Sequence, residues 1–167
     1  VTETVTYLAA LGSYANTSTQ INVYEFDVDS LTYSARLSFD DTEVNAITWK
    51  PDSNYLTVGG LNISGTTDLI NYRLTDAMLV ETNLINLSTT DPVRALDWKP
   101  DGNYLAAGFG SHVSIRNPNL SLLSSNAEID FNDYLDYRSV VNSLRWNPIT
   151  DQLAVGVDFL EVNKLRD

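Results

Sequence analysis

The chain has 167 residues and a formal net charge of −12 at pH 7, which comes from 22 acidic and 10 basic residues. This length and a hydrophobic fraction of 43% are typical of one globular domain with a sizeable core, and they exclude a disordered chain. The acidic balance argues against nucleic-acid and anionic-membrane binding, no apolar run is long enough for a transmembrane helix, and the absence of cysteine excludes disulfides and thiolate zinc sites.

An internal repeat organises the predicted elements. Trp49, Trp98 and Trp146 are separated by 49 and 48 residues. Around each tryptophan, the same residue types recur five and two positions before it and two, seven and ten positions after it. These positions hold Val44, Val93 and Val141; Ile47, Leu96 and Leu144; Pro51, Pro100 and Pro148; Leu56, Leu105 and Leu153; and Gly59, Gly108 and Gly156. A repeat of this length predicts an array of equivalent structural units.

The repeat predicts one domain, 1–167, with units at approximately 1–43, 44–92, 93–140 and 141–167. The first unit is partial, because Tyr7 and the three residues after it match Tyr104 and its successors. About three and a half units are therefore expected. The chain would begin in the second strand of a unit and stop near the end of a third strand.

Each unit is predicted to contain four short strands, because Val, Ile, Tyr, Phe and Thr dominate the runs between turns and no segment keeps a helical period. Pro-Asp-Ser and Pro-Asp-Gly supply turns after the first strand. The predicted first strands are 44–50, 93–99 and 141–147, and the second strands are 55–59, 104–108 and 152–157. The third strands are 20–27, 68–75, 112–116 and 159–163, and the fourth are 33–39, 78–87 and 120–131.

Apolar residues lie on both faces of the first strands, which indicates a small sheet packed between two neighbours. A repeat of 40–50 residues with four antiparallel strands is typical of a β-propeller blade, so the predicted fold class is all-β. Three and a half blades do not close a ring. The fold is therefore expected to belong to a larger ring, whose other blades come from the same chain or from another one.

The segment from Val93 to Gly108, with its Pro-Asp-Gly turn and Leu-Ala-Ala-Gly strand, resembles the blades of WD-repeat β-propellers. The resemblance covers the whole chain, but the match is divergent. The Gly-His dipeptide of that family is absent before Val44, Val93 and Val141, and its closing Trp-Asp survives at best as Phe26-Asp27. The hydrogen-bonded tetrad of the family is therefore not expected here.

The sequence offers no assembled catalytic set, so an enzyme is the less favoured interpretation. His112 is the only histidine and lies near the turn between two strands, and no Gly-x-Ser-x-Gly motif accompanies it. Gly108-Phe109-Gly110 lacks the Lys-Ser/Thr and the helix that a phosphate loop requires. No catalytic, cofactor-binding or metal residue is assigned.

Acidic residues gather at the predicted strand ends, and clustered carboxylates are the ligands that calcium prefers. Their spacing does not match the twelve-residue calcium loop, so solvated turns are the favoured interpretation and calcium stays open as the one cofactor to consider. The groups are Asp27 and Asp29; Asp40, Asp41 and Glu43; and Asp130, Asp133 and Asp136. Asp52 and Asp101 are interpreted as turn formers.

Partner contacts are expected where the units differ from one another, in the loops 13–19, 61–67 and 130–139. The last loop holds Phe131, Tyr134, Tyr137 and Arg138, and tyrosine and arginine are common at the energetic centres of protein interfaces. These four residues are the candidate contact site. The alternative is that their rings cover the outer edge of a blade.

The favoured function is a non-enzymatic scaffold for protein–protein interaction, with an unidentified protein partner. One alternative is a propeller hydrolase or lyase, which needs carboxylates that converge in the channel. The other is a carbohydrate-binding propeller, which needs exposed tryptophan or tyrosine rings.

Asn, Thr and Ser make up 47 of the 167 residues, and Asn-x-Ser/Thr sequons occur at Asn16, Asn62, Asn86 and Asn119. This surface chemistry favours an extracytoplasmic or secreted location.

Overall fold

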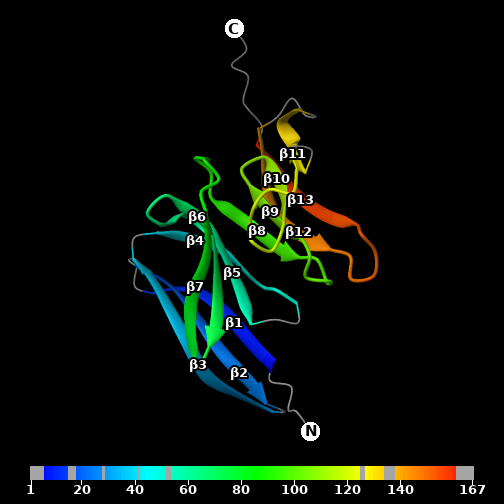
Figure 1. Ribbon diagram of the computed structural model, residues 1–167. Helices are drawn as coiled ribbons and strands as arrows, with labels where there is room; N and C mark the ends of the chain where they lie inside the picture. The colour runs from blue at the N-terminus through cyan, green and yellow to red at the C-terminus, as the bar shows by residue number, and fades with distance from the viewer. Residues whose placement is uncertain are drawn as a thin grey trace.

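The computed structural model describes residues 6–14, 18–27, 29–40, 42–51, 54–124, 127–133 and 138–160. These residues form four antiparallel sheets that follow one another along the chain (Figure 1). The sheets consist of β1 (Thr6–Tyr14), β2 (Ser18–Asp27) and β3 (Ser30–Asp40); β4 (Glu43–Trp49), β5 (Tyr55–Ser64), β6 (Thr67–Thr75) and β7 (Met78–Ile85); β8 (Val93–Trp98), β9 (Leu105–Phe109), β10 (His112–Arg116) and β11 (Glu128–Asp130); and β12 (Arg138–Trp146) and β13 (Leu153–Leu160).

The prediction of an all-β fold with four-stranded antiparallel blades is confirmed. The second and third sheets each contain four strands in simple up-and-down order. The described helical structure is limited to a single 3-10 turn, η1 (Phe131–Asp133). No helix among the described residues has the length and apolar character needed to cross a membrane.

Several predicted segments differ from the structure. The sequence predicts a strand over 120–131, but among the described residues of this segment only β11 and an isolated bridge between Arg116 and Leu122 form. The cause is a turn in which Leu120 adopts a φ of 69° and is completely buried, while its carbonyl accepts a hydrogen bond from Arg116 Nη1 at 2.9 Å. Leu120 therefore folds inward instead of extending along the sheet edge.

The expected loop at 61–67 is instead the end of a hairpin. Strands β5 and β6 continue to a tight turn at Gly65, whose φ of 65° favours glycine. Ile63 is 4% exposed and anchors this extension to the core. At the other end of the chain, Phe159 and Leu160 belong to β13, so the third strand predicted at 159–163 does not begin there, and residues 161–163 lie outside the described part.

One strand of each sheet lies on a common inner edge. Strand β1 lies beside β4, β4 beside β8, and β8 beside β12. We call these four strands the inner strands. The recurring valine, aliphatic residue and tryptophan all lie on β4, β8 and β12. The most regular part of the sequence repeat therefore corresponds to the inner strands.

The recurring valine and glycine form one contact between neighbouring sheets. A Cβ atom placed on Gly59 would lie 2.7 Å from Val93 Cγ1 and 2.9 Å from Leu96 Cδ1. At the next interface, a Cβ atom on Gly108 would lie 2.6 Å from Val141 Cγ1. Because no side chain fits in either place, each glycine is the hole that receives the valine of the following blade.

We predict that Gly108→Ala destabilises the fold by about 1–3 kcal/mol, because the added methyl group overlaps Val141. Val141→Ala should partly relieve the overlap, so the double variant should lose less stability than the sum of the two single losses. Gly12→Ala is the matched control, because no atom lies within 4 Å of its added Cβ. Urea denaturation measures all four variants, and equal losses at Gly12 and Gly108 would contradict the contact.

The three tryptophans occupy equivalent places but are not equally buried. Trp98 is 3% exposed and Trp146 is 9% exposed, as expected, whereas Trp49 is only half-buried and lies against Tyr7 at a ring distance of 6.2 Å. The prediction of a largely buried ring is therefore confirmed for Trp98 and Trp146.

Trp98 has a polar partner in the preceding blade. Its Nε1 donates to Thr57 Oγ1 at 2.9 Å, Thr57 donates to Asn71 Oδ1 at 2.7 Å, and Asn71 Nδ2 donates to the Pro118 carbonyl at 3.0 Å. The repeat places Ala9 and Ala106 where the second blade has Thr57. This difference explains why the Nε1 atoms of Trp49 and Trp146 are buried without a hydrogen-bond partner among the described residues.

We predict that Thr57→Ala costs about 1–3 kcal/mol of unfolding free energy, because it leaves the Trp98 indole N–H buried without an acceptor. Thr57→Ser retains the hydroxyl and should cost clearly less. Thermal unfolding of both variants checks the ranking. A loss with serine as large as that with alanine would assign the effect to the missing methyl group instead of the hydrogen bond.

Candidate functional site

Each of β4, β8 and β12 contains a β-bulge directly after the recurring valine. The pairing register shifts between Val44 and Ala46, between Val93 and Ala95, and between Val141 and Ser143. A bulge leaves one residue out of the ladder and redirects its side chain, and bulges are frequent at rims and binding sites. The residues at these bulges are Asn45, Arg94 and Asn142.

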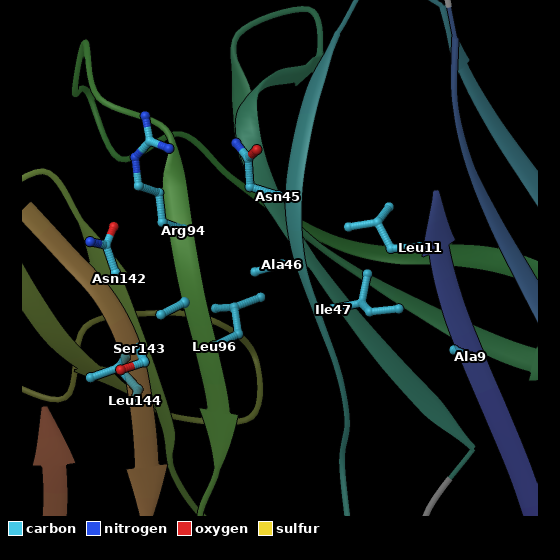
Figure 2. A pocket seen from close by; sticks show the side chains of 11 residues that line it. Ala9, Leu11, Asn45, Ala46, Ile47, Arg94, Leu96, Asn142, Ser143 and Leu144 are labelled. Carbon is cyan, nitrogen blue, oxygen red and sulfur yellow. The ribbon is translucent and has the colours of Figure 1, made fainter. Parts of the chain in front are cut away.

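The inner strands line an open pocket of about 450 Å³ below these bulges (Figure 2). The recurring aliphatic residues Ile47, Leu96 and Leu144 contribute its apolar wall, together with Ala9 and Leu11 from β1. Ligand sites of this size commonly combine an apolar wall with a few polar groups, and here the polar groups contribute more of the exposed lining than the aliphatic side chains do.

The polar groups at the bulges are not equivalent. Arg94 is exposed, and the structure shows no hydrogen bond or ion pair for it among the described residues. Asn45 Nδ2 is buried and has no hydrogen-bond partner in the described part. Asn142 Nδ2 is occupied, because it donates to Asp158 Oδ2 at 2.5 Å. In Figure 2, Arg94 and Asn45 rise from neighbouring strands toward the same end of the pocket.

Leu11 stands at a repeat position that is glycine in the other blades. By the repeat register it occupies the position of Gly59, Gly108 and Gly156. Its side chain packs against the core cluster that contains Val44 and lies near Ile47 at the pocket wall (Figure 2). The pocket therefore has an additional apolar side chain at its first-blade end.

Sequence comparison identifies the family of the chain. The model of the family "Eukaryotic translation initiation factor eIF2A" matches residues 12–119, which is almost two thirds of the chain. The chain belongs to the eIF2A family. This is a family of WD40-like β-propellers, which agrees with the resemblance to WD-repeat blades at the level of the propeller fold. No curated protein sequence matches the chain.

The segment that matches the eIF2A family includes the bulges at Asn45 and Arg94. It ends before β11, β12 and β13, so the match does not include Asn142 or the loop proposed for partner contacts. The family assignment therefore supports the fold of the first three sheets. The ligand that the pocket binds has to be inferred from the residues that line it.

A second pocket of about 430 Å³ lies where the same inner strands end. It is lined mainly by the three tryptophans and by the prolines that follow them. Its carboxylate, Asp97, is already engaged: Oδ2 accepts the Trp146 backbone N–H at 2.6 Å, and Oδ1 lies 3.4 Å from Arg145 Nη1. The arrangement ties the third blade to the fourth.

Lys99 joins the turns of the third and fourth blades at this end of the inner strands. Lys99 Nζ lies 2.6 Å from Asp101 Oδ2 and 2.9 Å from Asp151 Oδ1, in the turn of the next blade. Hydrogen bonds to these carboxylates raise the pKa of Lys99 above its ordinary value. Asp101 also accepts the Asn103 backbone N–H at 2.9 Å, which supports its predicted role as a turn former. Asp52 lies outside the described residues.

The predicted contact loop is described only in part. Phe131 is half-buried in η1, Tyr134 and Tyr137 lie outside the described residues, and Arg138 is described only as the first backbone position of β12. Most of the candidate contact site therefore lies outside the described residues. Their contact role stays a prediction.

A polar network holds the base of this loop. Ser111 Oγ donates to Asp130 Oδ1 at 2.5 Å, Asn132 Nδ2 donates to Ser111 Oγ at 2.9 Å, and Asn132 Oδ1 accepts the Ser139 backbone N–H at 3.1 Å. Burial acts to raise the pKa of Asp130, but the hydrogen bonds from Ser111 and Asn132 and the nearby His112 together hold it below its ordinary value. This network joins β10 and β11 to the start of β12.

His112 is the first residue of β10 and is not part of a nucleophilic triad. Its ring stacks on Phe109 with centroids 5.5 Å apart, and its Nε2 lies 3.6 Å from Asp130 Oδ2. Ser111 Oγ also lies 3.3 Å from His112 Nδ1. In a triad the imidazole separates the serine from the carboxylate, whereas here the buried Ser111 hydroxyl donates directly to Asp130. The cluster has the contacts of a structural network.

The acidic groups singled out as calcium candidates do not converge within the described part. No three His, Asp or Glu side chains there lie close enough to hold a metal ion. Asp41 and Asp136 lie outside the described residues, and the side chain of Asp40 is not described.

Sequence reasoning missed the three bulged residues, although a signal was present. The position after the recurring valine holds a polar residue in each of the three copies, Asn45, Arg94 and Asn142, although the valine before it recurs. A bulge converts such a position from a sheet face into a rim.

Proposed function

We propose that the chain is a non-enzymatic interaction scaffold whose inner strands present a binding site for a protein partner. The observation that carries this proposal is the set of three bulges, which bring Asn45, Arg94 and Asn142 to a pocket whose wall includes the recurring aliphatic residues. Interfaces commonly combine an apolar centre with a polar rim, and arginine is frequent at their energetic centres. A partner-binding propeller is compatible with the translation factor for which the family is named.

The two alternatives have weaker support. A propeller hydrolase or lyase needs converging carboxylates, and none of the residues that line the first pocket is acidic. A carbohydrate site needs open aromatic faces, whereas Trp98 and Trp146 are almost fully buried. The half-buried Trp49 is the feature that best fits the carbohydrate alternative.

We predict that a partner bound at the inner strands crosslinks to a benzophenone-bearing residue in place of Asn142, and not to one in place of Met78. Both positions are exposed, but Met78 lies on β7, away from the pocket. The crosslinked protein is identified by mass spectrometry, purified and titrated against the variants. Arg94→Glu should weaken its binding by about tenfold or more, because it reverses the rim charge.

Arg73→Glu is the matched control, because Arg73 is an exposed arginine on β6 and its replacement makes the same change in net charge. Binding should stay within about twofold of the parent protein. Equal crosslinking at positions 78 and 142, or an unchanged affinity with Arg94→Glu, would reject the inner strands as the partner site.

We also propose that both flanks of the described structure pack against further blades. On the fourth sheet, Phe159 is 54% exposed, and Gly156 has the position that receives a valine at the two preceding interfaces. On the first sheet, Leu31 and Tyr33 are 56% and 57% exposed. Exposed apolar surfaces of this kind commonly mark interfaces or aggregation sites.

Native mass spectrometry of the purified 167-residue polypeptide tests this proposal. We expect a dimer or a poorly soluble product, because association would bury the exposed apolar side chains of both flanks. A monomer of 18.5 kDa that melts cooperatively would show that the flanks are stable in water and would contradict the proposal.

A further inference from the structure

We infer that the pocket at the inner strands binds an acidic peptide segment, in which a Glu or Asp carboxylate pairs with Arg94 and the adjacent apolar side chain enters the pocket. This inference rests on the proposed function and specifies the chemistry of the partner at the same site. It follows from three properties of the lining residues: charge, hydrogen-bond capacity and the apolar volume below them.

The charge of the lining comes from one residue. Arg94 is the only charged side chain among the described residues that line the pocket, although the chain as a whole carries a net charge of −12. Arg94 is exposed and makes no ion pair among the described residues. A guanidinium presents a planar pair of donors that matches the two oxygens of a carboxylate, so the pocket favours an anionic group at this end.

Two donor groups of the rim, the Arg94 guanidinium and the Asn45 amide, have no hydrogen-bond acceptor among the described residues. Asn45 Nδ2 is buried without an acceptor in the described part of the chain, and burying such a group is unfavourable. The Asn142 amide group already donates to Asp158. A ligand that supplies oxygen acceptors near Arg94 and Asn45 would satisfy both, and a carboxylate has this capacity without introducing a competing donor.

The apolar volume distinguishes a peptide from a simple anion. A carboxylate alone does not fill a pocket of about 450 Å³, and the wall below the rim contains Leu11, Ile47, Leu96 and Leu144 together with alanines and Ser143. An aliphatic or aromatic side chain beside the carboxylate would bury apolar surface against this wall. Nucleic-acid phosphates fit less well, because the net negative charge of the chain repels a polyanion.

Titration of the ¹⁵N-labelled protein with short blocked peptides tests the inference by NMR. The probes are Ac-Gly-Glu-Leu-Gly-NH₂, the same peptide with Gln for Glu, the same peptide with Ser for Leu, and inorganic phosphate. We expect the Glu-Leu peptide to shift the amide resonances of Asn45, Arg94 and Leu96 and to bind about tenfold more tightly than the Gln peptide. The Ser peptide should bind about fivefold or more weakly than the Glu-Leu peptide, because it buries less apolar surface.

Two arginine variants separate a specific contact from general charge. In Arg94→Gln, the preference for Glu over Gln should disappear. In Arg73→Gln, which removes the same charge outside the pocket, the preference should remain.

The Asn45→Leu variant distinguishes a binding role of Asn45 from a structural one, because melting temperature and peptide affinity should change in different ways. It removes a buried amide that lacks a partner, so the melting temperature should stay the same or rise. Affinity for the Glu-Leu peptide should nevertheless fall about threefold or more, because a donor to the carboxylate is lost.

Each outcome has a definite meaning. Equal binding of the Glu and Gln peptides would overturn the carboxylate inference, but the proposed partner site would stand if crosslinking at Asn142 succeeds. Phosphate that shifts the same resonances as strongly as the Glu-Leu peptide would assign a simple anion site and overturn the peptide. The absence of any shift at several millimolar peptide would also overturn the inference.

Discussion

The contact between a valine side chain and a glycine without a Cβ atom sets the distance between the second and third sheets and between the third and fourth. Val93 and Val141 each point into the space that a side chain on Gly59 or Gly108 would occupy. Close approach at this point brings β4, β8 and β12 side by side and places their bulges at the same level. The pocket and its rim are therefore consequences of packing between sheets, and not of any single loop.

The sequence repeat was sufficient to predict the sheets, because the residues that recur are those that pack. Valine, glycine and tryptophan occur at fixed spacing since each interface imposes the same geometry. The prediction failed where local backbone geometry decided the result: Leu120 turns inward with a positive φ, and β5 continues to Gly65. Alternating β-forming residues do not distinguish a continued hairpin or an inward turn from a loop or a strand.

The site was harder to predict for a related reason. Recurrence identifies packing residues, so functional candidates were sought in loops, where the blades differ in length and composition. The structure instead places non-recurring polar residues inside the recurring motif, one position after the valine, where a bulge turns them toward the rim. A bulge changes the register by a single residue and leaves the apolar pattern around it intact, so sequence periodicity gives little warning of it.

The interfaces between blades also differ in how they satisfy buried polar groups. Trp98 is linked to the preceding blade through Thr57 and Asn71, whereas alanine at the equivalent positions leaves the indole N–H groups of Trp49 and Trp146 without acceptors among the described residues. The interface between the second and third blades therefore has a directional contact in addition to apolar packing, and Asn45 and Arg94 lie on its two inner strands. Because a hydrogen-bonded network fixes orientation more strictly than apolar contact does, this interface is the one best suited to hold two rim groups at a constant separation.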